Sequence, residues 1–272
     1  MSVFGEGRSA VVTGAAAGIG LAVARACLGR GMRVTMADAN RERLAQAAEE
    51  LGREAPGRVA HQVCDVREPS QVEALRDAAG EVDLLVLNAG IARPNKPWEG
   101  RAAWEETLGV NLWGVVNGLM AFVPGMLARG EGAVVALGSK QGITNPPGNA
   151  AYNVSKAGVR TLMEQLAWEF RQVEGGRLTA HLLVPGFTWT GMTAGERTDK
   201  PAGAWWPSQV AGRMIAGVES GAFYIICPDG EVDWETDRKR IAWGAGDITE
   251  GRPALSRWHP DWAEAFKAYR GP

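Results

Sequence analysis

The chain has 272 residues, of which 46% are hydrophobic and 22% are charged, with a formal net charge of -2 and a pI near 6.0. This composition is typical of a soluble globular protein and excludes the collagen-like, disordered and membrane-spanning classes. The weak negative charge provides no broad basic field, which argues against nucleic acid or an anionic membrane surface as a partner and favours a small molecule.

Short β-rich runs alternate with longer helical runs from the start of the chain. The predicted strands are 10–13, 33–37, 59–64, 84–87, 133–137, 179–184 and 222–227. The predicted helical runs are 18–29, 41–51, 70–79, 98–127, 150–172 and 207–220. This alternation predicts a doubly wound, Rossmann-type α/β fold, with a parallel sheet of about seven strands and helices on both faces.

Residues 1–272 contain no long linker and no internal repeat, which predicts a single domain. Two segments fall outside the alternation. Residues 187–207, rich in glycine, proline and charge, are typical of a mobile surface segment. Residues 228–272, called the extension below, contain four tryptophans, Trp234, Trp243, Trp258 and Trp262. We expect the extension to form a short helical appendage that buries its aromatic side chains against the core or a second subunit.

A glycine-rich turn, TGAAAGIG, follows the first predicted strand and leads directly into a helix. Its residues Gly14, Gly18, Ile19 and Gly20 have the spacing G-x-x-x-G-x-G. Glycines allow phosphate to approach the backbone N–H groups at a helix N-terminus, where the helix dipole favours negative charge. A glycine turn alone is a weak signal, but the strand before it and the helix after it predict a pyrophosphate cradle.

Asp38 closes the second predicted strand, about 20 residues after the glycine turn. An acidic side chain there accepts hydrogen bonds from the adenosine ribose and repels a 2′-phosphate, which favours NAD over NADP. Arg41 lies close enough in sequence to soften that repulsion. The alternative is that Asp38 is an ordinary turn or helix N-cap residue.

Further candidate cofactor contacts follow later strands. Asp65 and Val66 follow the third strand, and Asn88, Ala89 and Gly90 follow the fourth. Open α/β sheets bind ligands at the carboxyl ends of their strands, so these residues are candidates, although each alone is typical of a turn.

Four residues are candidates for catalysis. Asn111 lies in a predicted helix, and Ser139 follows the fifth strand. Tyr152 and Lys156 lie in the next helix, within the motif YNVSK. Residues four apart share a helix face, so these two side chains project toward the same place.

The motifs TGAAAGIG, NAG, Ser139 and YNVSK, in this order and spacing, resemble those of the short-chain dehydrogenase/reductase family over roughly residues 8–227. The resemblance implies an NAD(P)-dependent enzyme that interconverts an alcohol and a ketone. It implies that Tyr152 transfers the hydroxyl proton and that Ser139 orients the substrate oxygen. Lys156 would bind the nicotinamide ribose, and Asn111 would hold a water in the proton relay.

Proton transfer by Tyr152 requires a stabilised phenolate, because a phenol with a pKa of about 10 is a poor base near neutral pH. Lowering that pKa by about 3 units takes about 4 kcal/mol. We expect the Lys156 ammonium and the positive charge of the oxidised nicotinamide to supply it.

Cofactor contacts are also expected after the sixth strand. Pro185 and Gly186 follow that strand directly. The resemblance implies that Thr190 binds the nicotinamide carboxamide, and Thr188 is the alternative for that role.

The segment 187–207 corresponds to the substrate-facing region of the family. Its large apolar residues are Phe187, Trp189, Met192, Trp205 and Trp206. They predict a bulky or aryl-bearing alcohol or ketone as substrate. The alternative is that they pack in a subunit interface, where tryptophan is also enriched.

The three cysteines and three histidines are Cys27, Cys64, Cys227, His61, His181 and His259. None has metal-ligand spacing, so we expect buried reduced thiols, structural histidines and no metal site. Lys140, directly after Ser139, is expected to be an exposed or ribose-proximal charge. The N-terminus lacks the pattern of a signal sequence, and no apolar run approaches the roughly 18 residues that span a bilayer, so we expect a cytoplasmic protein.

The resemblance further implies a homodimer or homotetramer. Two other functions remain open. One is an epimerase or dehydratase with a tightly held cofactor, whose relatives usually have a longer chain and a different glycine spacing. The other is a catalytically silent, cofactor-binding regulatory protein, which has no chemical need for Ser139, Tyr152 and Lys156 together.

Overall fold

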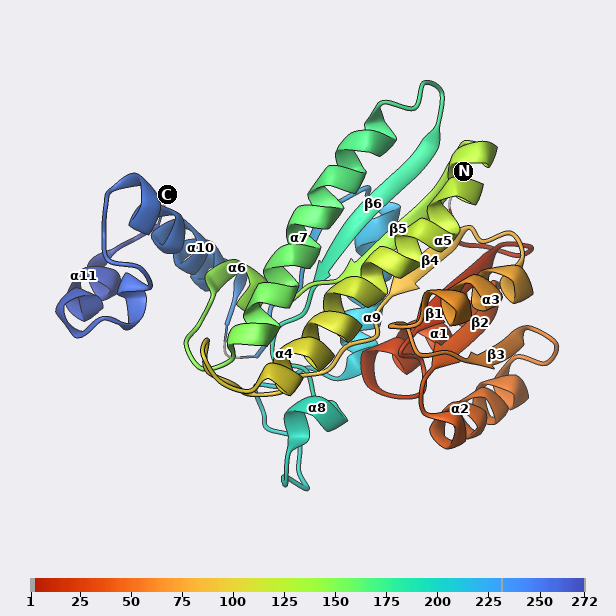
Figure 1. The fold of residues 1–272 in the computed structure, drawn as a ribbon, viewed down its shortest axis with the longest axis horizontal. Coiled ribbons are helices and arrows are strands. Elements are labelled where there is room, and N and C mark those ends of the chain that lie inside the picture. The colour runs from red at the N-terminus through yellow and green to blue at the C-terminus, as the bar shows by residue number, and fades with distance from the viewer. Residues whose placement is uncertain (1–2, 231, 272) are drawn as a thin grey trace.

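The structure, a computed structural model, describes residues 3–230 and 232–271. Its strands are β1 (Ser9–Thr13), β2 (Arg33–Asp38), β3 (Val59–Val63), β4 (Leu84–Leu87), β5 (Glu131–Leu137), β6 (Arg177–Val184) and β7 (Tyr224–Ile226). They form one sheet in the order β3-β2-β1-β4-β5-β6-β7, and each neighbouring pair is parallel (Figure 1). The predicted doubly wound fold with seven parallel strands is therefore confirmed.

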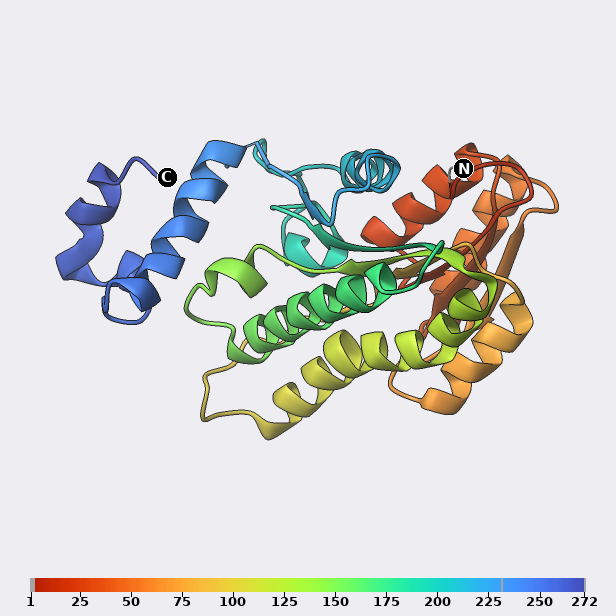
Figure 2. The same cartoon turned by 90° about the horizontal axis from the view of Figure 1, so that it is seen from above.

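Helices cover both faces of the sheet (Figure 2). One buried apolar cluster includes residues of α1 (Gly18–Gly29), α2 (Arg41–Glu54) and α9 (Pro207–Glu219). The other includes residues of α3 (Pro69–Ala79), α5 (Gly114–Arg129) and α7 (Ala150–Arg171). Successive strand residues alternate between the clusters: Ala10 and Val12 lie in the first, and Val11 lies in the second. The central strand β4 is apolar at every position because it is buried on both faces.

The predicted helix 98–127 is divided into α4 (Arg101–Leu108), the π-helical turn η1 (Gly109–Trp113) and α5. It begins later than predicted because Gly100 has a left-handed backbone, with a φ of 73°. A Cβ at Gly114 would lie 2.5 Å from Val66 Cγ2, so glycine is needed where this helix passes the end of β3.

The continuous run Arg101–Arg129 is long and apolar enough to cross a membrane, judged by length and composition alone. Half (50%) of the residues in its most apolar stretch are buried in the fold, as in a core helix of a globular protein. Its C-terminal part, α5, contacts α3, β4 and β5. Burial in the fold explains the composition of this run.

Other boundaries differ from the prediction by a few residues. β5 and β6 begin earlier than predicted, at Glu131 and Arg177, and pair with each other from these first residues. β7 is shorter than the predicted 222–227 and pairs along one side only, with β6. Two single-turn helices, α6 (Gln141–Thr144) and α8 (Gly191–Ala194), are too short to show a helical period in the sequence.

The extension forms helices, as predicted. They are α10 (Trp234–Thr249), the 3-10 turns η2 (Ser256–Trp258) and η3 (Pro260–Trp262), and α11 (Ala263–Ala268). Figures 1 and 2 show α10 and α11 standing away from the sheet at one end of the molecule.

Four aromatic side chains of the extension pack on one another, those of Trp243, Trp262, Phe266 and Tyr269. The Trp243 ring meets the Phe266 and Tyr269 rings edge-on at 5.3 Å and the Trp262 ring at 6.3 Å. The Arg252 guanidinium lies over the Trp243 ring at 3.9 Å. These rings thus form a cluster of their own rather than packing against the core, and their packing against a second subunit stays a prediction.

Candidate active site

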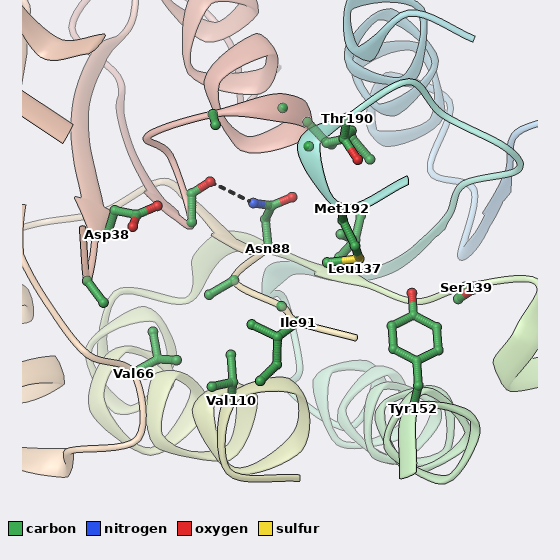
Figure 3. Close-up of a pocket in the computed structure, with 18 of the residues that line it drawn as sticks. Asp38, Val66, Asn88, Ile91, Val110, Leu137, Ser139, Tyr152, Thr190 and Met192 are labelled. Carbon is green, nitrogen blue, oxygen red and sulfur yellow. Dashed lines mark hydrogen bonds between the residues drawn. The ribbon is translucent and has the colours of Figure 1, made fainter. Parts of the chain in front are cut away.

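A cavity of about 610 Å³ opens along the carboxyl ends of the strands. The strand order reverses between β1 and β4, which is where doubly wound sheets bind ligands. Figure 3 shows Asp38 at one end of the cavity, Asn88 near its middle, and Tyr152 with Ser139 at the other end. Apart from two exceptions described below, all predicted site residues line this cavity.

The glycine turn has the backbone that a phosphate cradle requires. Gly14 and Gly18 are left-handed, with φ of 64° and 57°. Gly20 is the first exception: it does not line the cavity, but a Cβ there would lie 2.1 Å from the Gly14 carbonyl oxygen. The N-cap of α1 is Ala17, which has no polar side chain, so the first N–H groups of α1 are left to an anion. These features, with Ile19 in the lining, fit a dinucleotide pyrophosphate.

Asn88 ties the glycine turn to the end of β4. Its Nδ2 donates to the carbonyl oxygens of Thr13 at 2.9 Å and Gly14 at 3.1 Å, and its backbone N–H donates to Thr13 Oγ1 at 3.0 Å. Ala89 and Gly90 continue along the cavity lining. Asn88 therefore shapes the cradle as well as lining it.

Asp38 ends β2 beside the glycine turn. Its carboxylate accepts the backbone N–H of Ala16 at 3.2 Å and that of Asn40 at 2.9 Å. A fixed negative charge at this place suits ribose hydroxyls and opposes a 2′-phosphate. Arg43, rather than the expected Arg41, lines the cavity with Asp38. Arg43 is thus the arginine whose charge can reduce the repulsion between the Asp38 carboxylate and a 2′-phosphate.

Asp65 and Val66 line the cavity after β3, and Asp65 forms an ion pair with Arg67. The Arg67 Nε donates to both Asp65 carboxylate oxygens at 3.0 Å, and this hydrogen bonding lowers the pKa of Asp65. Figure 3 shows the aliphatic side chain of Val66 at the cavity wall. The cofactor contact of both residues stays a prediction.

Pro185, Gly186, Thr188 and Thr190 line the cavity after β6. The Thr188 hydroxyl donates to the Gly186 carbonyl at 3.2 Å. The Thr190 backbone N–H donates to Thr193 Oγ1 at 3.0 Å at the start of α8. Because both threonines reach the cavity, the choice between them for the carboxamide stays open.

Ser139 and Tyr152 lie at the far end of the cavity, with the Tyr152 hydroxyl directed into it (Figure 3). Ser139 Oγ accepts the Gln141 backbone N–H at 3.1 Å. Burial raises the pKa of Tyr152, and a hydrogen bond with Ser139 opposes that rise. The expected lowering of the phenol pKa is therefore not met by the protein alone.

Lys156 lies one helical turn after Tyr152, as expected from the motif. Its side chain is buried, its Nζ donates to the Leu137 carbonyl at 2.7 Å, and Nζ lies 5.7 Å from the centre of the Tyr152 ring. Burial lowers the pKa of Lys156 to about 8. The carbonyl at the end of β5 thus holds the amine beside the phenol.

Asn111 is the second exception, because it lies in η1 behind the cavity lining. Its Nδ2 donates to the Ile91 carbonyl at 2.9 Å and to Ser155 Oγ at 3.0 Å, and its Oδ1 accepts the Ile91 N–H at 2.8 Å. The side chain therefore joins the segment after β4 to α7. Its predicted role in holding a water stays a prediction.

Lys140 is not exposed, contrary to one expectation, and it does not line the cavity. Its side chain is 17% exposed, and its Nζ lies 3.2 Å from Asp229 and 2.6 Å from Asp237. Asp229 is 89 residues further along the chain, so no local pattern indicates this pairing.

Part of the cavity wall is apolar. Ile91, Val110, Leu137 and Met192 contribute to it (Figure 3), and the charged Arg93 and Glu106 line the cavity as well. Met192 is the single member of the five large apolar residues of 187–207 that lines the cavity. Trp205 packs against the buried core, and Trp206 is 51% exposed at the start of α9. The tryptophans of this segment therefore do not line the cavity, and their packing in a subunit interface stays a prediction.

Several lining residues were not anticipated, chiefly Arg43, Ile91, Arg93, Glu106, Val110 and Leu137. Ile91 directly follows Gly90, and Leu137 ends the strand before Ser139, so their positions at strand ends carried a usable signal. Glu106 of α4 and Val110 of η1 also line the cavity, and only the tertiary fold brings these elements there.

The three cysteines, Cys27, Cys64 and Cys227, are buried free thiols, as predicted. His181 is buried, and its ring nitrogens contact the Ala222 carbonyl at 2.7 Å and Thr179 Oγ1 at 2.9 Å, which fits a structural role. Within residues 3–230 and 232–271, no group of three His, Cys, Asp or Glu is arranged to hold a metal ion.

Known proteins are similar in sequence to this chain. A family model described as short chain dehydrogenase matches residues 8–201. The chain is 36% identical to a galactitol 2-dehydrogenase (L-tagatose-forming) of Cereibacter sphaeroides, over 69% of this chain and 74% of that protein. It is 35% identical to a cis-4-hydroxycyclohexanecarboxylate dehydrogenase of Sinomonas cyclohexanicum, over 71% of this chain and 78% of that protein.

A solved structure shares the fold. It is a short chain dehydrogenase/reductase from Burkholderia phymatum in complex with NAD, with 30% identity and a TM-score of 0.83. The match covers 93% of this chain and 98% of the other, which is more than residues 1–227 can supply, so it includes part of the extension. With this fold and these motifs, the chain belongs to the short-chain dehydrogenase/reductase family and is an oxidoreductase that acts on CH–OH groups.

Proposed function

We propose that this enzyme is an NAD(H)-dependent dehydrogenase that interconverts a bulky, largely apolar secondary alcohol and its ketone. The observation that carries the proposal is the aliphatic wall of Ile91, Val110 and Leu137 beside the facing hydroxyls of Ser139 and Tyr152. A secondary alcohol seated on that wall buries its carbon skeleton and keeps one oxygen near both hydroxyls. A polyol there would bury further hydroxyls without partners, which is costly.

The residues at this end of the cavity divide the proton chemistry among them. Bound along the glycine turn, the nicotinamide cofactor would accept or supply the hydride. Ser139, held by the Gln141 N–H, orients the substrate oxygen. Tyr152 takes the hydroxyl proton during oxidation and returns it during reduction. Lys156, held on the Leu137 carbonyl, stabilises the phenolate and binds the nicotinamide ribose.

The remaining predicted residues would serve cofactor binding. Their positions around one cavity support this assignment. Asp38 would select NAD by its charge, and Thr190 or Thr188 would bind the carboxamide. Asn111 would support a water of the proton relay from behind the lining.

A panel of alcohols tests the substrate class. Oxidation of 1-phenylethanol, cyclohexanol, cis-4-hydroxycyclohexanecarboxylate, galactitol and 2-propanol is followed by cofactor absorbance with NAD and with NADP. We expect the cyclic and aryl-bearing alcohols to have kcat/KM values at least about tenfold above those of galactitol and 2-propanol, because burial of each additional CH₂ contributes about 0.8 kcal/mol. Preference for galactitol would overturn the apolar-substrate proposal.

Asp38→Ala is expected to narrow the preference for NAD over NADP by about tenfold or more, because a like charge no longer faces the 2′-phosphate while Arg43 remains. The measurement is the ratio of kcat/KM values for the two cofactors. Asp38→Asn keeps an acceptor for the Ala16 and Asn40 amides, so it separates the charge from the hydrogen bonds. An unchanged ratio in both variants would count against selection by Asp38.

Assembly, location and domain limits are further proposals. We propose a homodimer or homotetramer, which is supported by exposed Trp113 and Met120 side chains on the run Arg101–Arg129. Light scattering of the purified chain measures this directly. A cytoplasmic location, one domain over 1–272 and a substrate-facing segment at 187–207 are proposed on the sequence pattern alone.

A further inference from the structure

A buried cluster of charges lies beside the catalytic residues without belonging to the cavity. Lys140 stands between two carboxylates, with Nζ 3.2 Å from Asp229 Oδ2 and 2.6 Å from Asp237 Oδ2. The side chains are 17%, 6% and 4% exposed, respectively. These three residues come from three separate segments of the chain and are called the ion cluster below.

The lysine of the ion cluster is attached to the segment that holds Ser139. Lys140 follows Ser139 directly and is the N-cap of α6, and its carbonyl accepts the Thr144 N–H at 2.9 Å. The first residue of α6, Gln141, donates to Ser139 Oγ. A displacement of Lys140 therefore moves both the backbone and the hydrogen-bond donor that orient the Ser139 hydroxyl.

On its other side α6 packs tightly against α7. A Cβ at Gly142 would lie 2.6 Å from the carbonyl carbon of Lys156, so there is no space for α6 to approach further. α6 is thus held between the helix that bears Tyr152 and Lys156 and the ion cluster.

Asp229 connects the ion cluster to the segment after β6. Its Oδ2 accepts the Phe187 backbone N–H at 3.1 Å, and its Oδ1 accepts the Val232 N–H at 2.8 Å. A Cβ at Gly186 would lie 2.5 Å from Asp229 Oδ2, so this contact is close. The cavity residues Pro185 and Gly186 directly precede Phe187.

Asp237 brings the extension into the ion cluster. It lies in α10, which contacts α6, and Figures 1 and 2 both draw the two helices side by side. Burial raises the pKa of Asp237 and the Asp229 carboxylate adds to that rise, whereas Lys140 and Arg240 oppose it. The two carboxylates thus repel each other and are held together by the lysine.

From these contacts we propose that Lys140, Asp229 and Asp237 are positioning residues through which the extension fixes the orientation of Ser139 and of the segment after β6. The proposal rests on the role of Ser139 given above. It gives the extension an indirect role in the reaction. Asp237 of α10 is one of the two carboxylates that hold Lys140 and thereby the short helix α6 next to Ser139.

Amide hydrogen exchange of full-length variants tests the link without needing a substrate. Lys140→Met leaves two facing carboxylates without their cation, so we expect the amides of residues 141–145 to exchange at least about tenfold faster than in the wild type. Asp237→Asn removes the contribution of the extension alone and is expected to act in the same direction. Lys140→Arg keeps the charge and is expected to restore slow exchange.

Two matched variants serve as controls. Lys267→Met and Asp261→Asn remove exposed charges of the extension, at sites 71% and 84% exposed. Their exchange over residues 141–145 is expected to equal that of the wild type. If Lys140→Met does not fold, the proposal is tested by amide exchange over residues 141–145 in Asp237→Asn and Lys140→Arg. Exchange in Asp237→Asn indistinguishable from that in Asp261→Asn overturns the proposal.

Kinetics with NAD and 1-phenylethanol provide the second readout. Lys140→Met and Asp237→Asn are expected to lower kcat by about 10–100-fold while KM for NAD changes less than about threefold, because misplacing Ser139 weakens the transition state more than cofactor binding. Equal changes in kcat and in KM for NAD would indicate that the whole fold is perturbed, and they would contradict the proposal that these residues position Ser139. Full turnover in Tyr152→Phe would instead overturn the proposed function and leave the exchange result standing.

Discussion

Tyr152→Phe is expected to lower kcat by at least about 1,000-fold, because the substitution removes the group that exchanges a proton with the substrate oxygen. NAD binding is expected to stay within about threefold of the wild type, since the hydroxyl faces the substrate end of the cavity, remote from Asp38 and the glycine turn (Figure 3). The measurement combines steady-state turnover of 1-phenylethanol with quenching of tryptophan fluorescence by NAD.

A second tyrosine provides the matched control. Tyr224 is 49% exposed, and its hydroxyl donates to Glu164 on the surface, so Tyr224→Phe makes the same atomic change away from the cavity. Turnover in Tyr224→Phe is expected to equal that of the wild type. Comparable activity of the two variants would refute proton transfer by Tyr152.

The order of strands and helices was predictable because the spacing of apolar residues within each segment indicates which of its faces are buried. Strands such as β4 are apolar at every position, as expected for strands covered on both faces. A tight turn was predictable where glycines stand in a motif, as at Gly14 and Gly18, which have a left-handed backbone. The π-helical turn η1 was not predicted. Beside it Gly114 packs on Val66, a contact between segments far apart in sequence.

The same distinction separates the predicted from the unpredicted parts of the active site. Ser139, Tyr152 and Lys156 lie at strand ends or on one helix face, where spacing alone brings side chains together. Composition did not predict where the aromatic side chains of 187–207 lie, since Trp205 packs on the core and Trp206 is exposed. Aromatic content gives the amount of apolar surface in a segment, whereas the tertiary fold decides which side that surface faces.

Lys140 shows the limit of reading one segment at a time. Its neighbours in sequence suggested a solvated charge or a ribose contact, but its partners are Asp229 and Asp237. A buried lysine needs charged partners, and those of Lys140 come from the segment after β7 and from α10. Such pairs require the assembled structure.

Lys156→Met is expected to lower kcat by about 100–1,000-fold, because the phenolate of Tyr152 loses its neighbouring cation. The pH at which oxidation reaches half its maximum is expected to rise in this variant, since Tyr152 then ionises less readily. Lys267→Met is the control, as its amine is 71% exposed and pairs with Glu264 in the extension. An unchanged kcat and pH profile would contradict the assigned role of Lys156.

The same substitution is expected to raise stability at neutral pH. Burial lowers the pKa of Lys156 from 10.5 to about 8, so between these values the unfolded chain binds one proton more than the folded chain. The free energy of unfolding of the wild type should therefore rise with pH over this range, by at most about 3 kcal/mol at 1.36 kcal/mol per pKa unit. Below pH 8 the wild type bears the full cost of a buried charge, partly offset by the Leu137 hydrogen bond, and Lys156→Met does not.

Urea unfolding at pH 6.5, 8, 9.5 and 10.5 measures this linkage as a difference between variant and wild type, so that other titrating groups cancel. Lys156→Met is expected to be more stable at pH 6.5, with a gap that narrows above pH 8 as the buried amine of the wild type becomes neutral. Lys267→Met should show no pH-dependent gap, because its amine is solvated in both states. A gap for Lys156→Met that stays constant or widens above pH 8 would contradict the lowered pKa. Loss of turnover together with a gain in stability would identify Lys156 as a residue whose buried charge is retained for catalysis at a cost to the fold.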